Sequence, residues 1–191
     1  QRIDRLADLG RIDLVATADP GGPPEDRDLP WHDGLEALLG QHDVDIVSIA
    51  TPIGTHAALS TAAMAAGAHV MLEKPPVPSL PEFWRLLRTV KETGRALQVG
   101  FQSLGSAGVP RMRALLTDGT LGEVTGINAR GAWVRDRAYY GRAAWAGKRT
   151  VGGQRVADGV VTNPLAHAIA TALAIAGATG IDDLVSVTTE M

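Results

Sequence analysis

Short apolar runs that alternate with helical patterns constrain the fold of this chain more than any other feature of its sequence. The runs are Ile12–Ala18, Val44–Ala50, Ala68–Leu72 and Ala96–Gly100. Each has the length of a strand and is apolar almost throughout, which is typical of parallel strands buried on both faces. Because helical segments separate the runs, we predict an α/β fold with a doubly wound parallel sheet.

The segments between the runs have helical periodicity and recognisable ends. Ser79 and Glu82 have the spacing of a capping box at the start of one predicted helix. That helix is expected to end at Gly94 and to bury four apolar side chains, those of Phe83, Leu86, Leu87 and Val90. The other predicted helices are a first one that carries Ile3, Leu6 and Leu9, then Gly34–Leu39 and Thr55–Ala66.

The regular alternation of apolar runs with helical segments ends after Gly100, so we place a domain boundary near residues 102–108. We expect a sheet domain over residues 1–103 and part of a second, α+β domain over residues 104–191. Its predicted helices are Val109–Leu116 and Pro164–Ala176, and its predicted strands are Glu123–Val134 and Leu184–Thr189. An irregular stretch between them carries Tyr140 and Trp145, which we expect to line a substrate cleft, with core packing as the alternative.

The composition excludes several classes of function. The chain carries 18 basic and 21 acidic residues, so its formal charge of −3 offers no basic surface for nucleic acid or anionic lipid. It has no cysteine and its histidines lack the spacing of metal ligands, so we expect no metal site. The longest apolar stretch, Pro164–Ala178, is too short to span a membrane and predicts a buried helix. We expect a cytoplasmic protein with a small-molecule partner, although the absence of cysteine does not fix the compartment.

Polar residues follow the predicted strands at the edge where open parallel sheets bind ligands, beyond the carboxyl ends of the strands. They stand in Asp19-Pro20, Thr51-Pro52, Glu73-Lys74-Pro75 and Phe101-Gln102. Asp19 is suited to bind the adenosine ribose of NAD, and its carboxylate would repel the extra phosphate of NADP. A simpler interpretation of Asp19, a loop aspartate before a proline, is equally favoured. If Asp19 does bind the ribose, NAD is the expected cofactor and NADP is disfavoured.

Two segments carry candidate catalytic groups. An apolar strand delivers Lys74 to the sheet edge, where its ammonium can stabilise developing alkoxide charge on a substrate; a solvated lysine in a turn is the alternative. Asn163 and Pro164 predict a helix start, which puts His167 in the first turn, where the helix dipole disfavours imidazolium. A neutral imidazole suits a general base. Alternatively, Asn163 only caps the helix and His167 is a core histidine.

One motif that such a sheet leads us to expect is absent from the sequence. Dinucleotide-binding sheets carry G-x-G-x-x-G between the first strand and the first helix, and this chain contains no such motif. The chain starts in what looks like that first helix, so we expect the strand and its glycine loop to be missing. Without this pyrophosphate-binding loop, the chain by itself is expected to bind NAD poorly and to be inactive.

The order of these motifs resembles the Gfo/Idh/MocA family, the glucose–fructose oxidoreductase and inositol dehydrogenase group. The run from Val44 to Pro75 contains a TP-x-x-x-H element, an AG-x-x-V strand and EKP at the expected separations. Leu121–Val124 is similar to the entry into the family's second domain, and Asp158–His167 is similar to its catalytic segment. The resemblance covers essentially the whole chain but only part of a usual member, and it implies a Rossmann-type sheet, truncated at its start, followed by part of a substrate domain.

The resemblance also implies an activity and roles for single residues. Members of this family exchange hydride between NAD(P) and a hydroxyl or carbonyl carbon, commonly of a sugar, cyclitol or related compound. The resemblance makes Lys74 the catalytic lysine and His167 the acid/base, with Asn163 where many members have Asp. The implied cofactor-lining positions are Thr51, Pro52, His56, Glu73 and Gln102. A homo-oligomer is implied as well.

Departures from the family pattern leave other functions open. Asn163 cannot act as a carboxylate, so it can orient a substrate but cannot carry a proton or a charge. Ile53 replaces the Asn often found after TP and removes one polar contact. Besides a dehydrogenase, two functions remain compatible with the sequence. One is a binding protein that senses sugar or redox state without turnover, and the other is an enzyme that uses NAD transiently to cleave glycosides.

Overall fold

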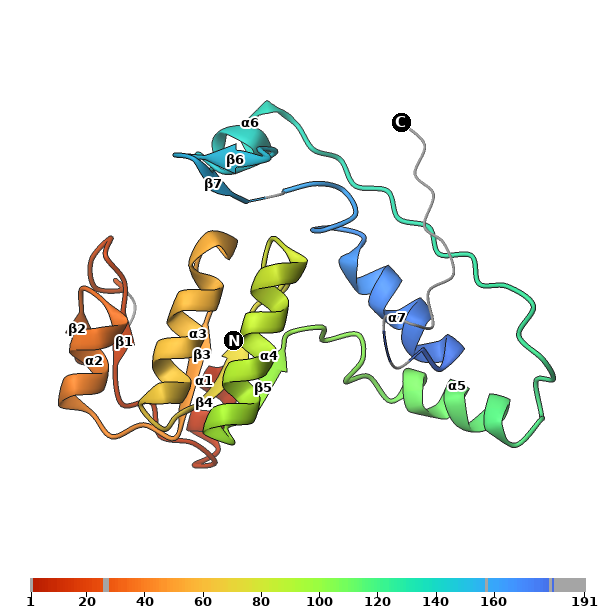
Figure 1. The fold of residues 1–191 in the computed structure, drawn as a ribbon, viewed down its shortest axis with the longest axis horizontal. Helices are drawn as coiled ribbons and strands as arrows, with labels where there is room; N and C mark the ends of the chain where they lie inside the picture. The colour runs from red at the N-terminus through yellow and green to blue at the C-terminus, as the bar shows by residue number, and fades with distance from the viewer. Residues whose placement is uncertain (1, 26–27, 157, 179, 181–191) are drawn as a thin grey trace. The chain divides into compact units, whose positions relative to one another are not determined.

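The computed structural model describes residues 2–25, 28–156, 158–178 and 180, and it divides into two compact units (Figure 1). The first unit comprises Gln1–Thr51, Thr55–Leu72 and Ser79–Gln98. The second comprises Pro52–Gly54, Glu73–Pro78 and Val99–Met191. The chain therefore passes between the units several times, and the short segment after the third apolar run groups with residues from the C-terminal half.

Parallel strands form the centre of the first unit. A three-stranded sheet has the order β3-β4-β5, with β3 at Ile46–Ile49, β4 at His69–Leu72 and β5 at Leu97–Val99. Strands β3 and β4 run parallel, with Ile46 opposite His69 and Ile49 opposite Leu72. A separate parallel pair is formed by β1 (Thr17–Ala18) and β2 (Trp31–His32). The predicted α/β class with parallel strands and intervening helices is confirmed.

The first strand is much shorter than its apolar run predicts. Only Thr17–Ala18 is a strand, whereas the prediction extended over Ile12–Ala18, and β2 was not predicted at all. A strand exists only as far as a neighbour accepts and donates its backbone hydrogen bonds. Because the neighbour of β1 is the two-residue β2, the rest of the apolar run has no ladder to join within the described residues.

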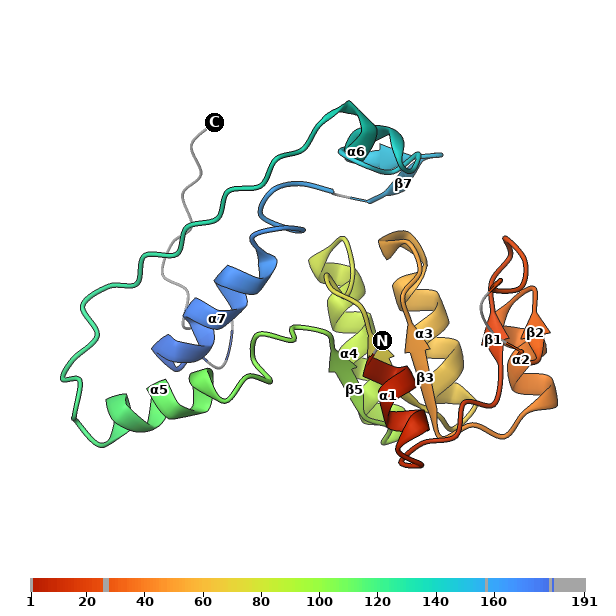
Figure 2. The ribbon, with the colours of Figure 1, turned by 180° about the vertical axis from the view of Figure 1, so that it is seen from behind.

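Helices cover one face of the three-stranded sheet much more fully than the other, where Ile46 is 60% and Met71 is 45% exposed. In Figures 1 and 2, α3 and α4 lie on one face and α1 lies on the other. The elements are α1 (Arg2–Asp8), α2 (Leu35–Gln41), the 3-10 helix η1 (Ile53–Thr55), α3 (His56–Ala65) and α4 (Leu80–Thr93). The core lies between the sheet and the α3–α4 face, and its most deeply buried large side chains include Met64, Leu72 and Leu86.

Helix α4 has its predicted N-cap at Ser79 and its predicted end at Gly94, but its capping bond and its buried face differ from the prediction. Ser79 is the N-cap, but its hydroxyl donates to the Glu82 carboxylate instead of accepting from a backbone N–H, so the predicted capping box does not form. Leu86 is 1% exposed, whereas Leu87 is 37% exposed. Two adjacent leucines on one helix thus have very different environments, because only one of them faces α3 and the sheet.

This contrast gives a direct test of the core. We expect Leu86→Ala to lower the free energy of unfolding by about 2–5 kcal/mol, because it removes buried methyl groups and leaves a cavity. Leu87→Ala is the matched control and is expected to cost less than about 1.5 kcal/mol. Urea unfolding followed by circular dichroism measures both. Equal losses in the two variants would contradict the packing described for α4.

The second unit consists of helices and one small hairpin. Its elements are α5 (Gly108–Thr117), α6 (Arg137–Gly141), β6 (Thr150–Val151), β7 (Gln154–Arg155) and α7 (Ala166–Ala176). The predicted strand Glu123–Val134 is wrong: the stretch between α5 and α6 has no strand and is exposed. The backbone there lacks a partner strand in the described part of the chain. The predicted strand Leu184–Thr189 lies outside the described residues.

Helix α7 is less buried than its apolar sequence predicts. None of its residues is fully buried, and Ile169 is 40% exposed. Helix α5 packs against α7 and covers only one side of it, so the prediction of a buried helix is wrong for the part of the chain described. Among the described residues, no helix combines the length and apolarity needed to cross a membrane.

Candidate functional site

In the first unit, Asp19 directly follows β1 and is exposed. Its carboxylate Oδ1 accepts a hydrogen bond from the Gly21 N–H at 2.7 Å, and its carbonyl accepts from the indole Nε1–H of Trp31 at 3.0 Å. A short local turn therefore orients the carboxylate at the surface. The exposed position suits a residue that binds a ribose hydroxyl.

Thr51 follows β3, and the residues around it brace the turn. The hydroxyls of Thr51 and Thr55 lie 2.7 Å apart, and Nε2 of His56 lies 2.8 Å from the Thr51 carbonyl. The His56 side chain is only 2% exposed. A ring so deeply buried offers no surface to a ligand, so the prediction that His56 faces one is wrong. Its observed contact is with the backbone of Thr51.

In the second unit, Lys74 reaches a residue from the far end of the chain. Its ammonium donates to the side-chain Oδ1 of Asn163 at 2.7 Å and to the backbone carbonyl of Asn163 at 3.2 Å. Both residues are half-buried and stand 89 positions apart in the sequence. The alternative interpretation of Lys74, a lysine solvated in a turn, does not describe this side chain.

Asn163 does not cap the helix that follows it. Helix α7 begins at Ala166, and its N-cap residue is Leu165, without a side-chain capping bond. The Asn163 side chain instead has two other partners: Oδ1 accepts from Lys74, and Nδ2 donates to Asp158 Oδ1 at 2.7 Å. The prediction of a capping role is therefore wrong, because hydrogen bonds to distant Lys74 and to nearby Asp158 occupy the two ends of the amide.

Asp158 is a member of this cluster that the sequence analysis did not single out. Besides accepting from Asn163, it accepts from the Gly147 N–H at Oδ2, at 2.7 Å. Its backbone N–H donates to the Lys148 carbonyl at 2.9 Å. A hydrogen-bonded chain therefore runs from an ammonium through a neutral amide to a carboxylate. The one sequence signal for it was the position of Asp158 in the same segment as Asn163 and His167.

His167 lies in the first turn of α7, as predicted. Its Nδ1 atom is buried, and no residue in the described part of the chain hydrogen-bonds to it. The imidazole packs edge-on against the ring of Phe101, with ring centroids 6.0 Å apart. Packing, rather than a hydrogen bond to Nδ1, therefore holds this ring.

The two aromatic residues expected at the substrate cleft, Tyr140 and Trp145, lie just before Gly147 and Lys148, whose backbone is hydrogen-bonded to Asp158. Tyr140 is 51% exposed on α6, and half-buried Trp145 has the Arg142 guanidinium 4.8 Å from its ring centroid. Gly147 has φ +68°, and a side chain added there would meet the ring of Tyr140 at 2.8 Å. A glycine is thus required at this close approach.

The remaining predicted cofactor residues lie at exposed turns. Pro52 and Glu73 are exposed, and the Glu73 carboxylate accepts the Lys74 backbone N–H. Gln102 is exposed as well, and its carbonyl accepts from the Gly105 N–H at 3.2 Å. All three side chains are accessible to a ligand, in contrast to His56.

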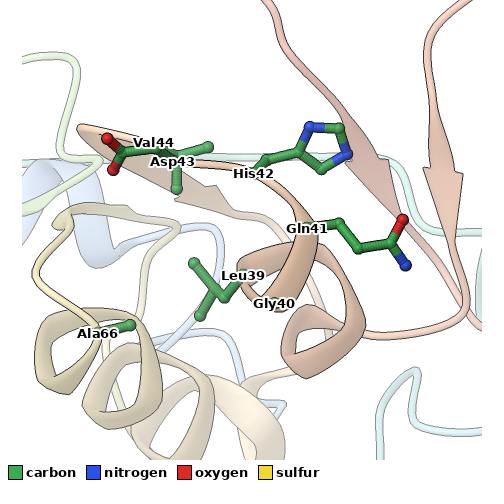
Figure 3. A pocket seen from close by; sticks show the side chains of 7 residues that line it. All are labelled: Leu39, Gly40, Gln41, His42, Asp43, Val44 and Ala66. Atoms are coloured by element: carbon green, nitrogen blue, oxygen red, sulfur yellow. The ribbon is translucent and has the colours of Figure 1, made fainter.

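A pocket of about 350 Å³ lies elsewhere in the first unit (Figure 3). The end of α2, the turn into β3 and Ala66 form it, and it contains none of the predicted site residues. His42 lines it and also lies 2.9 Å from His32, measured between the Nε2 atoms. The pocket stands at the amino end of β3, whereas ligands of open parallel sheets bind beyond the carboxyl ends.

Comparison with known proteins assigns the family. Residues 13–101 match the model of an oxidoreductase family with an NAD-binding Rossmann fold, Gfo/Idh/MocA. The chain belongs to this family. The matched stretch contains β1 to β5 and the EKP sequence that carries Lys74, so it includes the strand ends described above.

Relatives of known description extend the match beyond the family segment. D-xylose dehydrogenase of Paenarthrobacter nicotinovorans is 30% identical over 67% of this chain and 34% of its own length. A glycosyl hydrolase family 109 protein of Saccharopolyspora erythraea is 31% identical over 74% of this chain and 33% of its own length. The WlbA dehydrogenase of Bordetella pertussis, in complex with NADH and UDP-GlcNAcA, has a TM-score of 0.71 and 25% identity over 88% of this chain and 51% of its own. The chain thus spans about a third of these curated relatives and about half of the solved structure.

The close approach at Gly147 provides a test of the aromatic segment. We expect Gly147→Ala to destabilise the chain by about 1–3 kcal/mol, because a Cβ there combines a left-handed backbone with a clash against Tyr140. Gly141→Ala is the control, since a Cβ at Gly141 meets nothing within 4 Å. Urea unfolding measures both variants. An unchanged stability of the Gly147 variant would contradict the packing of Tyr140 described here.

Proposed function

We propose that this chain is part of an enzyme that transfers hydride between NAD and a CH–OH or carbonyl carbon of a sugar, cyclitol or related compound. The observation that carries the proposal is the Lys74 ammonium, held by Asn163 four residues before His167. The relatives support the substrate class: one is named a D-xylose dehydrogenase, and another was solved with NADH and a nucleotide sugar.

The residues present fit the adenosine part of NAD. Asp19 offers an exposed, oriented carboxylate at the end of β1, which favours NAD over NADP because a carboxylate repels the additional phosphate. We assign the cofactor-lining surface to Thr51, Pro52, Glu73 and Gln102, with His56 supporting the Thr51 turn from behind. In this proposal residues 1–103 form the cofactor-binding domain, and residues 104–191 form part of the substrate and dimerisation domain.

The chemistry follows from the side chains of the second unit. When bound, NAD supplies the acceptor or donor of the hydride. The Lys74 ammonium donates to the substrate oxygen and stabilises the negative charge that develops there. His167 takes the hydroxyl proton in the oxidative direction, and Asn163 holds Lys74 without itself carrying a proton.

Further parts of the proposal concern the surroundings of this chemistry. Tyr140 and Trp145 present aromatic rings suited to the apolar C–H faces of a sugar ring, so we assign them to substrate binding. We expect the full-length protein to form a homo-oligomer, to work in the cytoplasm and to bind neither nucleic acid nor membranes.

Replacement of Lys74 tests the proposed chemistry in the full-length protein. We expect Lys74→Met to lower kcat by about 10²–10⁴-fold, because the developing charge loses its stabilising donor. The dissociation constant for NAD, measured by calorimetry, should change little because Lys74 is assigned to the substrate oxygen. Lys91→Met, in the exposed last turn of α4, is the matched control. Full turnover by the Lys74 variant would refute the proposed function.

Glycoside cleavage with transient use of NAD is a second candidate, favoured by the similarity to a glycosyl hydrolase family 109 protein. The two reactions differ in their net products. A dehydrogenase accumulates NADH, seen by its absorbance, when supplied with NAD and a panel of free sugars and polyols. A glycoside-cleaving enzyme releases the leaving group from aryl glycosides without net NADH. We expect NADH accumulation; aglycone release alone would replace the first candidate with the second.

A further inference from the structure

We infer that Asp158 is a positioning residue: it fixes the orientation of the Asn163 amide, and the amide in turn aims the Lys74 ammonium. The inference rests on the proposed function, because it assigns the ammonium to a substrate oxygen. It is carried by a separate observation, the pair of 2.7 Å hydrogen bonds at the two ends of one amide.

The chemistry of the two neighbours allows only one orientation of the amide. An ammonium only donates hydrogen bonds, and an ionised carboxylate only accepts them. Asn163 must therefore turn Oδ1 toward Lys74 and Nδ2 toward Asp158, as the structure has it. In the flipped amide, two donors would face each other at Lys74 and two acceptors at Asp158. Without the carboxylate, nothing in the cluster would penalise that flip at its Nδ2 end.

Asp158 is itself held by further hydrogen bonds to the backbone. Its Oδ2 accepts the Gly147 N–H, and its own N–H donates to the Lys148 carbonyl. These backbone contacts belong to the segment that carries Tyr140 and Trp145, which we assign to substrate binding. The carboxylate thus connects the residues expected to hold the substrate with the ammonium expected to act on it.

The arrangement leaves the ammonium suited to its task. Asn163 accepts two of its three N–H bonds, so in the described part of the chain one N–H remains for a substrate oxygen. The Asp158 carboxylate is bonded to the other end of the neutral amide, so the amide lies between it and the ammonium.

An exchange of the two side chains tests the inference in the full-length protein. Asp158→Asn removes the charge that selects the amide orientation, and we expect kcat to fall about 10–100-fold, the scale of a misplaced catalytic group. In the double variant D158N/N163D, the amide at position 158 donates to the carboxylate at position 163, that carboxylate accepts from Lys74, and the total charge is unchanged. We expect the exchange to recover most of the lost kcat. A purely structural role would not predict recovery by a swap that reverses both residues.

A second readout does not depend on turnover. The side-chain amide protons of Asn163 give a pair of nuclear magnetic resonance signals, assigned by their loss in Asn163→Asp. With the carboxylate in place we expect slow exchange of these protons with solvent, and Asp158→Ala should accelerate it at least about tenfold because an accepting partner is removed. Exchange as fast in the native protein as in this variant would overturn the inference.

The outcomes separate this inference from the proposed function. If Lys74→Met is inactive while Asp158→Asn keeps full activity, the positioning role fails and the proposed function stands. If Lys74→Met is fully active, the proposed function fails, and the amide exchange rates still test the hydrogen-bonded chain. If Asp158→Asn does not fold, the folded double variant decides: activity above that of Asn163→Asp alone supports the inference, and activity no higher overturns it.

Discussion

A half-buried ammonium, with no carboxylate bonded to it among the described residues, is the constraint on which the second unit depends. Lys74 is removed from much of its solvent, so its charge must be met by oxygen atoms of the protein. Asn163 provides two of them, and Asp158 supplies the negative charge one hydrogen bond further on. Segments far apart in the sequence are brought together because each carries one member of this chain of donors and acceptors.

In the first unit, the main structural feature is that polar residues follow the carboxyl ends of apolar strands. Strands β3 and β4 bury Ile49, Val70 and Leu72 on one face, and polar residues follow each strand at its carboxyl end. The alternation of apolar runs with helical segments is visible in the sequence, and it explains why the parallel sheet and the helices α1 to α4 could be predicted. Strand lengths could not, since the extent of a ladder depends on the neighbour, as the short β1 and the strandless stretch before α6 illustrate.

How far the site could be predicted depended on whether a residue's contacts are visible in its local sequence. Lys74, Asn163 and His167 were singled out because residue type and local spacing express their chemistry, and their catalytic roles stay predictions. The capping role predicted for Asn163 was wrong because its side chain bonds instead to Lys74, 89 positions away, and to Asp158, five positions away. His56 was misjudged because periodicity does not distinguish a helix start at the surface from one under a turn. Asp158 was missed because a carboxylate in a glycine-rich loop looks like any solvated one.

The side chains of His167 and Lys74 differ in how well their polar atoms are hydrogen-bonded. For Nε2 to accept a proton, the neutral ring must carry its other proton on Nδ1. That atom is buried, and none of the described residues accepts a hydrogen bond from it. Among the described residues Nδ1 has no partner in either neutral tautomer, whether as donor or as acceptor, and leaving a buried polar atom unsatisfied costs about 1–3 kcal/mol. The Lys74 ammonium differs, because the side-chain and backbone oxygens of Asn163 both accept hydrogen bonds from it.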